Sequence, residues 1–180
     1  MVPTQDHYQI ARDFLESGVH VLVEKPMTAT LEEADSLIQL AHANSLILQV
    51  GHLERFNPAV VAAKEHVHQP FFLETHRLAS FTERGTEVDV ILDLMIHDLD
   101  LILSLVKSKP VQIDASGVGV VSETLDIANA RIQFESGCVA NITASRISTK
   151  KMRKMRIFQP NSYISVDFIE GFSEVYYMDD

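Results

Sequence analysis

The stretch His20-Val21-Leu22-Val23-Glu24-Lys25-Pro26 decides the fold class that we expect. Its run of β-branched and aliphatic residues is typical of a strand buried on both faces of a parallel sheet, ending at Lys25-Pro26. Before it, residues 4–17 carry apolar side chains at helical spacing, with Thr4 as the expected N-cap. Gly18 stands where a left-handed residue commonly ends a helix. The chain is therefore predicted to begin with a helix that leads into a parallel strand.

A second helix and strand follow directly. Thr30-Leu31-Glu32-Glu33 is a capping box, which predicts a helix running to about Asn44. Residues 46–50 are a second buried strand, closed by Gly51. Helix, strand, helix and strand with short links are typical of a doubly wound α/β sheet. We therefore expect residues 1–51 to form part of a Rossmann-type domain that exposes a sheet edge and one flank of its core.

The pattern changes after Gly51, where we place the domain boundary. A short helix is expected at 57–68 and a long one at Glu87–Val106. Strands are expected at residues 71–80, 111–122, 127–135, 138–145, 155–158 and 163–168, with a hairpin turn at 135–138. Several successive strands after a helix indicate an α+β domain with a mainly antiparallel open sheet. Residues 52–180 are expected to form this second domain.

The composition narrows the possible partners and the compartment. The formal net charge of -10 argues against nucleic acid and against an anionic membrane as partners. There is no apolar run of about 18 residues, and Met1-Val2-Pro3-Thr4 does not begin a signal peptide. The single cysteine, Cys138, excludes an internal disulfide and favours a reducing cytoplasm.

A cluster of basic residues is the exception to the acidic composition. We call it the basic cluster, and its members are Arg146, Lys150, Lys151, Arg153, Lys154 and Arg156. One interpretation is a solvated strand end and loop. The other is a patch that binds a phosphorylated substrate.

The first candidate site is Lys25, at the carboxyl end of a strand, where ligands bind in open α/β sheets. A lysine there can hydrogen-bond a ribose or substrate hydroxyl and stabilise an alkoxide, although it also fits an ordinary charged residue leaving a strand. Pro26 directly after it is a candidate for a cis peptide bond. A weaker candidate is Pro3-Thr4-Gln5-Asp6-His7, whose helix start suits an anion or ribose but is equally explained by a simple cap.

The second candidate site is on the helix expected at 87–106. Its polar residues fall within a sector of roughly 80° on an otherwise apolar helix; they are Asp89, Asp93, His97 and Asp100. Asp93 and His97 are four residues apart, so the carboxylate can orient the imidazole as a general base. The alternative is a solvated stripe with a local ion pair. Asp98 lies on the opposite, apolar side, where we expect a structural hydrogen bond.

Three motifs are missing from the sequence, two that are typical of metal sites and one that is typical of dinucleotide binding. Asp93 and His97 offer two metal ligands, but neither a His-Glu-x-x-His motif nor paired cysteines occur, so no metal site is expected. No Gly-x-Gly-x-x-Gly occurs, and Gly117-Val118-Gly119 lies within a predicted strand rather than before a helix. The dinucleotide fingerprint is therefore not in these 180 residues.

Taken together, these residues resemble the Gfo/Idh/MocA family of sugar oxidoreductases. The resemblance rests on residues 2–7, on 18–26 with Glu24-Lys25-Pro26, on 30–34, on 51–58, and on the Asp-x-x-x-His pair at Asp93 and His97. Within the family, residues 74–101 are most similar to enzymes that oxidise the 3-hydroxyl of UDP-N-acetylglucosamine.

The resemblance implies NAD or NADP as cofactor and reversible oxidation of a sugar or nucleotide-sugar hydroxyl. It implies that Lys25, Asp93 and His97 are catalytic, with His97 as the general acid and base. The cofactor would lie along Pro3, Thr4, His7, Glu24, Lys25 and Pro26. The substrate would contact Arg55, and its diphosphate Arg146 and Arg153. Family members usually form homodimers or homotetramers through the open sheet of the second domain.

Both ends depart from the family pattern, which begins with a strand, a Gly-rich turn and a helix and ends with further strands and a helix. We therefore expect a fragment that is inactive alone. Two alternatives are a non-catalytic remnant that binds a sugar or a partner chain, and a metal-dependent isomerase or lyase using His97 with the aspartates.

Overall fold

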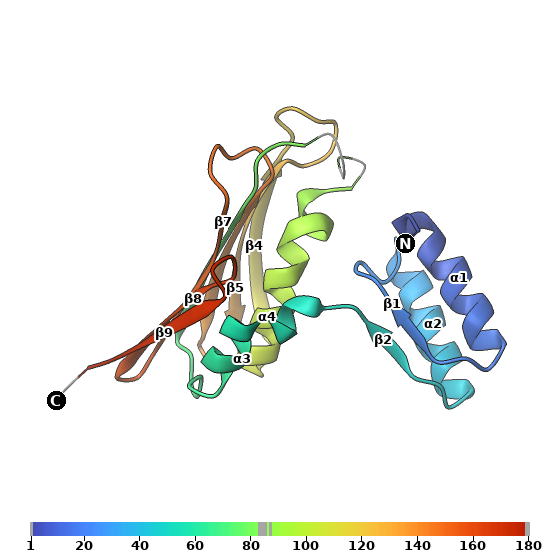
Figure 1. The fold of residues 1–180 in the computed structure, drawn as a ribbon, viewed down its shortest axis with the longest axis horizontal. Coiled ribbons are helices and arrows are strands. Elements are labelled where there is room, and N and C mark those ends of the chain that lie inside the picture. Colours follow the sequence, from blue (N-terminus) through green and yellow to red (C-terminus); the bar gives the residue numbers. More distant parts are fainter. Residues whose placement is uncertain (1, 83–85, 87, 179–180) are drawn as a thin grey trace. The chain divides into compact units, whose positions relative to one another are not determined.

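The computed structural model describes residues 2–82, 86 and 88–178. The chain separates into two compact units, Met1–His52 and Leu53–Asp180 (Figure 1). Among the described residues, none of the helices has the length and apolarity needed to span a membrane.

The first unit contains two helices and two parallel strands, as expected. In chain order these are α1 (Thr4–Glu16), β1 (Val21–Val23), α2 (Leu31–Ala43) and β2 (Leu48–Val50). The strands pair in register from Val21↔Leu48 to Val23↔Val50. Both helices pack on the strands through a small apolar core that is centred on Leu15 and Leu37.

The two strands are not buried on both faces, so that expectation is wrong for this unit. Leu22 is 68% exposed and Ile47 62% exposed. Both helices pack their core residues against one side of the two-stranded sheet, and the outward side chains of the strands have no second layer over them within the described residues of the unit. The expected open flank is therefore confirmed.

Three helix-end residues of this unit were predicted from the sequence, and the structure agrees with two of these predictions. Thr30 and Glu33 form the predicted capping box, and Gly18 has the predicted left-handed backbone, with φ of 79°. The prediction that Thr4 caps α1 is wrong, because Pro3 is the N-cap and its carbonyl accepts a hydrogen bond from the Asp6 N–H at 3.0 Å. Thr4 is thereby the first helical residue.

The second unit is built on a seven-stranded sheet, preceded by a 3₁₀ turn at Leu53–Phe56 and helix α3 (Pro58–Lys64). The strand order is β4-β5-β6-β3-β7-β8-β9. In chain order the strands are β3 (Phe72–Leu78), β4 (Pro110–Val118), β5 (Ile127–Phe134), β6 (Val139–Ser145), β7 (Met152–Gln159), β8 (Ser162–Asp167) and β9 (Phe172–Tyr177). Only the β3–β6 pair is parallel, so the predicted mainly antiparallel open sheet is confirmed.

Two strand predictions need correction. Strand β9 is missing from the prediction, because apolar and polar residues do not alternate regularly along Phe172–Tyr177 and none of its side chains is fully buried. Strand β7 begins at Met152, three residues earlier than expected, since Arg153 and Lys154 belong to the strand rather than to a loop.

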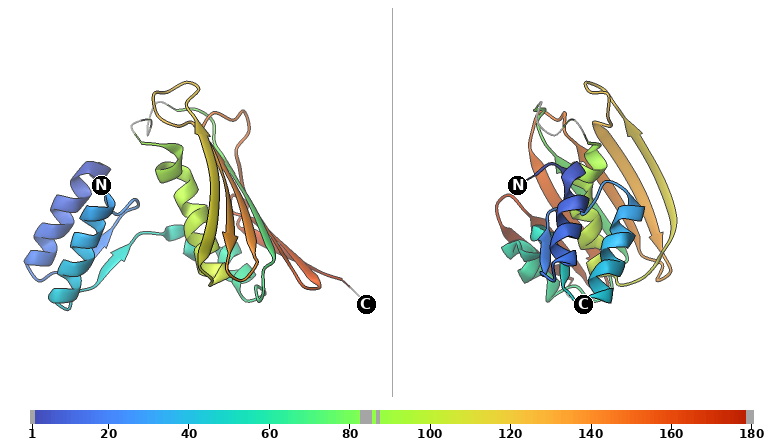
Figure 2. Two further views of the ribbon diagram at one scale, coloured as in Figure 1. Left: turned by 180° about the vertical axis from the view of Figure 1, so that it is seen from behind. Right: turned by 90° about the vertical axis from the view of Figure 1, so that its right-hand side faces the viewer.

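Helix α3 and helix α4 (Ile96–Val106) cover one face of the sheet (Figure 1, Figure 2). Alternate residues of every central strand point into this layer, including Leu73, Ile142 and Ile157, and they pack with Leu101 and Ile102 of α4. The core of the second unit lies between this face and the two helices.

The predicted long helix starts later than expected and is not α-helical throughout. Glu87 lies outside the described residues. A π-helical segment, Ile91–Met95, precedes α4. Two hydrogen bonds hold Asp89 and Val90 against the backbone of Leu125. The Leu125 N–H donates to Asp89 Oδ1 at 2.8 Å, and the Val90 N–H donates to the Leu125 carbonyl oxygen at 3.0 Å. These contacts replace the first helical turn that the sequence suggested.

Candidate functional site

Glu24, Lys25 and Gly51 directly follow the two parallel strands of the first unit, so they lie at the same end of the sheet, where the strands have their carboxyl ends. The Lys25–Pro26 peptide bond is cis, as the sequence suggested. The Glu24 carboxylate packs over Gly51, since a Cβ atom at Gly51 would lie 3.3 Å from Glu24 Oε2. A side chain at the position after β2 would therefore require the Glu24 carboxylate to shift by a few tenths of an ångström.

His7 connects helix α1 to this edge. Its Nδ1 donates a hydrogen bond to the carbonyl oxygen of Pro26 at 2.8 Å, and its ring is buried. A carbonyl oxygen only accepts, so Nδ1 carries a proton, and in the neutral imidazole Nε2 is then the acceptor. Pro3 and Thr4 lie one turn before His7, at the start of the helix.

These residues fit one half of a dinucleotide. A carboxylate, an ammonium group and an imidazole acceptor at the carboxyl end of parallel strands suit ribose hydroxyls and a nicotinamide amide. The Gly-rich turn that would hold the pyrophosphate is absent from the sequence. The residues present thus suit the nicotinamide and ribose of the cofactor but not its pyrophosphate.

The four polar residues that were predicted to share one face of the long helix have different contacts in the structure. Asp89 accepts the Leu125 backbone N–H. Asp100 binds Arg55 through a two-point contact, with Arg55 Nε 2.7 Å from Asp100 Oδ2. Asp93, in the π-helical segment, and His97, in the first turn of α4, are both half-buried and are the two that stay candidates for chemistry.

Arg55 has a structural contact that the sequence did not suggest. It was expected near the substrate, and the structure places its guanidinium against Asp100, with half of the side chain still exposed. The Arg55–Asp100 pair joins the 3₁₀ turn at the start of the second unit to helix α4.

A buried ion pair lies beside the helix that carries His97. Arg77 of β3 is only 2% exposed and donates to both oxygens of Asp98, at 3.0 Å from Nε and 2.8 Å from Nη2. It also donates to Glu54 at 3.3 Å, and its guanidinium lies 5.3 Å from the centre of the Phe168 ring. The structural role predicted for Asp98 is confirmed.

Sequence analysis missed Arg77 and Glu54. A signal for Arg77 was available, because it alternates with the core residues Leu73 and Thr75 along β3 and so had to face the helices. A buried arginine needs a carboxylate partner, and Asp98 was the unexplained acid on the apolar side of the helix.

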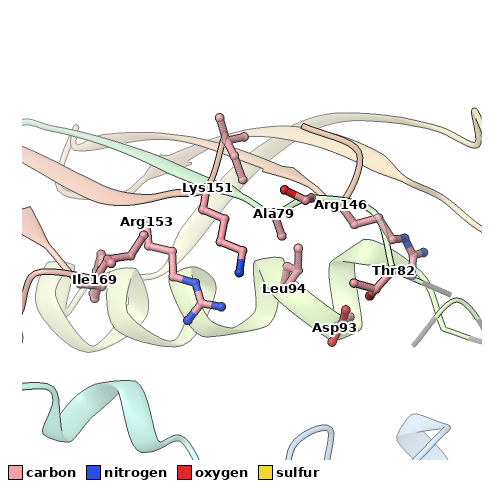
Figure 3. Close-up of a pocket in the computed structure, with 11 residues that line it drawn as sticks. Ala79, Thr82, Asp93, Leu94, Arg146, Lys151, Arg153 and Ile169 are labelled. Carbon is pink, nitrogen blue, oxygen red and sulfur yellow. The ribbon is translucent and has the colours of Figure 1, made fainter. Parts of the chain in front are cut away.

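A pocket of about 520 Å³ opens beside Asp93 (Figure 3). Leu78, Leu94, Phe168 and Ile169 form apolar walls, and Asp93, Arg146, Lys151 and Arg153 contribute charged groups. Asp93 is the one predicted catalytic residue that lines it. The pocket brings Asp93 together with Arg153, which was predicted to contact the substrate.

Arg146 lines the same pocket but is buried, and its predicted contact with the substrate stays a prediction. Its Nε lies 3.1 Å from Asp126 Oδ1, and its Nη2 donates to the carbonyl oxygens of Val88 at 2.8 Å and Leu125 at 2.6 Å. The guanidinium therefore joins the end of β6 both to the loop before β5, through Leu125 and Asp126, and to Val88 before the π-helical segment.

The Asp126 carboxylate is strongly stabilised in its ionised form. A hydrogen bond from the Ser122 hydroxyl and backbone N–H groups of Val121, Val120 and Ser122 hold its pKa well below the usual value of 3.8. Asp126 thus stays charged beside Arg146 over the physiological pH range. Among the described residues, no group of three or more His, Cys, Asp or Glu side chains is arranged to bind a metal ion.

Comparison with known proteins gives two family matches. Residues 1–52 match the model described as "Oxidoreductase family, NAD-binding Rossmann fold". Residues 59–162 match the "GFO/IDH/MocA C-terminal domain".

Individual relatives agree with these matches. The chain is 42% identical over 178 residues to UDP-N-acetylglucosamine 3-dehydrogenase from Acidithiobacillus ferrooxidans, which covers 98% of this chain and 57% of the relative. It is 27% identical over 165 residues to scyllo-inositol 2-dehydrogenase (NAD(+)) from Bacillus subtilis, covering 82% of this chain and 48% of the relative. The chain thus spans about half the length of the curated relatives it matches.

Solved structures show the same fold. A structure of the Acidithiobacillus ferrooxidans enzyme superposes with a TM-score of 0.94 at 42% identity, covering 98% of this chain and 59% of that one. An NAD binding oxidoreductase from Klebsiella pneumoniae superposes with a TM-score of 0.91 at 19% identity, covering 100% of this chain and 56% of that one. Because the C-terminal family model alone spans more than half of the 180 residues, this chain belongs to the GFO/IDH/MocA oxidoreductase family.

Proposed function

We propose that this chain belongs to an NAD-dependent dehydrogenase that oxidises a hydroxyl of a nucleotide sugar. The observation that carries the proposal is the 42% identity to UDP-N-acetylglucosamine 3-dehydrogenase over 98% of the chain. The position of Asp93 in the wall of a pocket that also holds basic side chains supports it.

The first unit is proposed to bind the nicotinamide half of the cofactor. Lys25 would hydrogen-bond the ribose and the substrate hydroxyl, and Glu24 and the Nε2 of His7 would accept hydrogen bonds from cofactor groups. The remaining contacts along the cofactor are assigned to Pro3, Thr4 and Pro26. The bound cofactor supplies the acceptor for the hydride.

The second unit is proposed to handle the proton. If the bound cofactor accepts a hydride from the carbinol carbon, the His97 imidazole would accept the hydroxyl proton, and the electron pair of the broken O–H bond would form the carbonyl. Asp93 would orient the imidazole or the substrate. The Lys25 ammonium would stabilise the negative charge that develops on oxygen.

We also propose that the chain self-associates through the face of the sheet opposite α3 and α4. An aromatic row crosses four strands on that face, from Phe72 through Phe158 and Tyr163 to Tyr176, with ring centres 5.0 to 6.0 Å apart. Aromatic residues are enriched at stable protein interfaces. Sedimentation of the Tyr163→Arg variant, compared with Arg131→Ala on the same face, tests this assignment.

The test of the dehydrogenase is a chimera in which the N-terminal segment of the Acidithiobacillus ferrooxidans relative precedes this chain. NADH binding would be followed by fluorescence, and NAD reduction with UDP-N-acetylglucosamine by absorbance. The chimera should bind NADH about a hundredfold more tightly than the 180-residue chain, because two charge-assisted hydrogen bonds to the pyrophosphate supply roughly that factor. It should also reduce NAD.

Two results would contradict the proposal. If both proteins bind NADH equally, the cofactor does not depend on a Gly-rich turn outside these residues. If the chimera binds NADH and the nucleotide sugar but never transfers hydride, the chain is a binding remnant rather than a dehydrogenase.

A further inference from the structure

Strand β7 divides the basic cluster between the two faces of the sheet. Met155 and Ile157 are buried under the helices, so Arg153, two residues before Met155, points to the same side. Lys151, just before the strand, also lines the pocket there. Lys154 and Arg156 alternate with them and lie on the opposite face.

The two pairs differ in their charge partners. On the open face, Lys154 Nζ lies 3.1 Å from Asp167 Oδ2, and Arg156 pairs with Glu74. In the part of the chain that the structure describes, no carboxylate lies within ion-pair distance of Lys151 or Arg153. Within the described residues, these two positive charges are thus not held in an ion pair, although Asp93 lines the same pocket.

Both charged side chains point into the pocket. Figure 3 shows the Lys151 ammonium group and the Arg153 guanidinium group both projecting into the space above the helix, with Ile169 beyond Arg153 and Asp93 on the other side. A volume of about 520 Å³ is within the range of small-molecule sites. Like charges at a partly apolar wall repel each other, and an anion between them removes that cost.

We infer that Lys151 and Arg153 form the subsite for the diphosphate of the substrate, and that the sugar extends from it toward Asp93. The identification of the ligand as a nucleotide sugar rests on the proposed function, but the assignment of an anion site to Lys151 and Arg153 does not. The guanidinium fork suits two phosphate oxygens at once, and the lysine adds a mobile point charge. A free polyol has no group that uses either residue, so this pair selects nucleotide sugars.

The pyrophosphate of the nicotinamide dinucleotide has the same chemistry as a nucleotide-sugar diphosphate. The experiment therefore measures UDP, UDP-N-acetylglucosamine and NADH separately, by calorimetric titration of the 180-residue chain. The Lys151→Ala and Arg153→Ala variants are compared with Lys154→Ala and Arg156→Ala, which remove the same charges from the opposite face. Melting temperatures show whether each variant is folded.

Each pocket variant should weaken UDP binding roughly 10- to 100-fold, the usual effect of one lost charge-assisted hydrogen bond, while the matched variants change it less than about threefold. Arg153→Lys should retain part of the affinity. UDP should bind almost as tightly as UDP-N-acetylglucosamine, and NADH binding should not respond to the pocket variants.

Three results would overturn the subsite: no UDP binding to the wild-type chain, equal weakening by the open-face variants, or a loss that affects NADH instead of UDP. Failure of the proposed function gives a different pattern. A chimera that never transfers hydride, combined with a selective loss of UDP binding in the pocket variants, would refute the dehydrogenase and leave the subsite standing. An active chimera whose KM for UDP-N-acetylglucosamine is unchanged by Arg153→Ala would refute the subsite and support the dehydrogenase.

Discussion

The Nδ1 atom of His7 donates a 2.8 Å hydrogen bond to the carbonyl oxygen of Pro26, nineteen residues further along the chain. This contact joins the second turn of α1 to the turn that follows β1. It fixes the tautomer of the imidazole and holds the backbone on which Lys25 stands.

We expect His7→Phe to loosen this turn. The aromatic ring preserves packing but leaves the buried Pro26 carbonyl without a donor, which costs about 1–3 kcal/mol. Hydrogen exchange of peptides from residues 1–52 measures the loss directly. Gln39→Ala, on the exposed side of α2, is the control and should change stability by less than about 0.5 kcal/mol. Unchanged exchange in His7→Phe would mean that the contact contributes nothing.

The two arginine–carboxylate pairs on α4 should differ sharply in their energetic weight. Asp98→Ala leaves the buried Arg77 with only its longer contact to Glu54 and should cost about 3–5 kcal/mol, whereas Asp100→Ala should cost about 1 kcal/mol or less because Arg55 remains half in water. Urea denaturation followed by circular dichroism compares them.

The Arg77→Met/Asp98→Leu double variant separates charge from packing. Because it removes both charges at similar volume, it should recover most of the stability lost in Asp98→Ala. If Asp98→Ala were no more damaging than Asp100→Ala, the buried pair would not be what fastens α4 to β3.

Stability of the second unit should fall in acid because of Asp126. Its pKa in the folded chain is held below 3.8 by the Ser122 hydroxyl and the backbone N–H groups. As the pH falls below about 4, the unfolded carboxylate takes up a proton that the folded one still refuses, so the stabilisation present at higher pH is lost. The urea midpoint should therefore drop between about pH 5 and pH 2.5, and Asp126→Asn should drop less. Asp114→Asn, on the exposed strand β4, should behave like the wild type.

His97→Gln tests the general base in the active chimera. The glutamine cannot accept the proton, so kcat should fall roughly 10²–10⁴-fold and the acid limb of the pH–rate profile should disappear. NADH affinity should not change, and the melting temperature controls for folding. A folded variant that keeps about a third or more of kcat with an intact pH profile would assign His97 a structural role.

Local patterns were sufficient for most of the fold. The capping box at Thr30 and Glu33 involves neighbours three residues apart, and the alternation in β5 and β6 follows from the pleat, so both could be predicted without tertiary information. The cap was assigned to Thr4, but its immediate neighbour Pro3 is the N-cap, and β9 was missed because its apolar and polar residues do not alternate regularly along the sequence.

The sequence by itself determined the fold class, the family resemblance and the identities of Lys25, Asp93 and His97 as candidates, because each depends on residue types and short spacings. Only the tertiary structure decided that Arg146 is buried with Asp126, that Asp98 belongs to Arg77, and that Lys151 and Arg153 face a pocket while Lys154 and Arg156 do not. Arg77 and Asp98 are 21 residues apart and Arg156 and Glu74 are 82 apart, so no local pattern pairs them. The charge partner of a side chain is set by strand register and by the face it occupies, and both are fixed only when the sheet and its helices pack together.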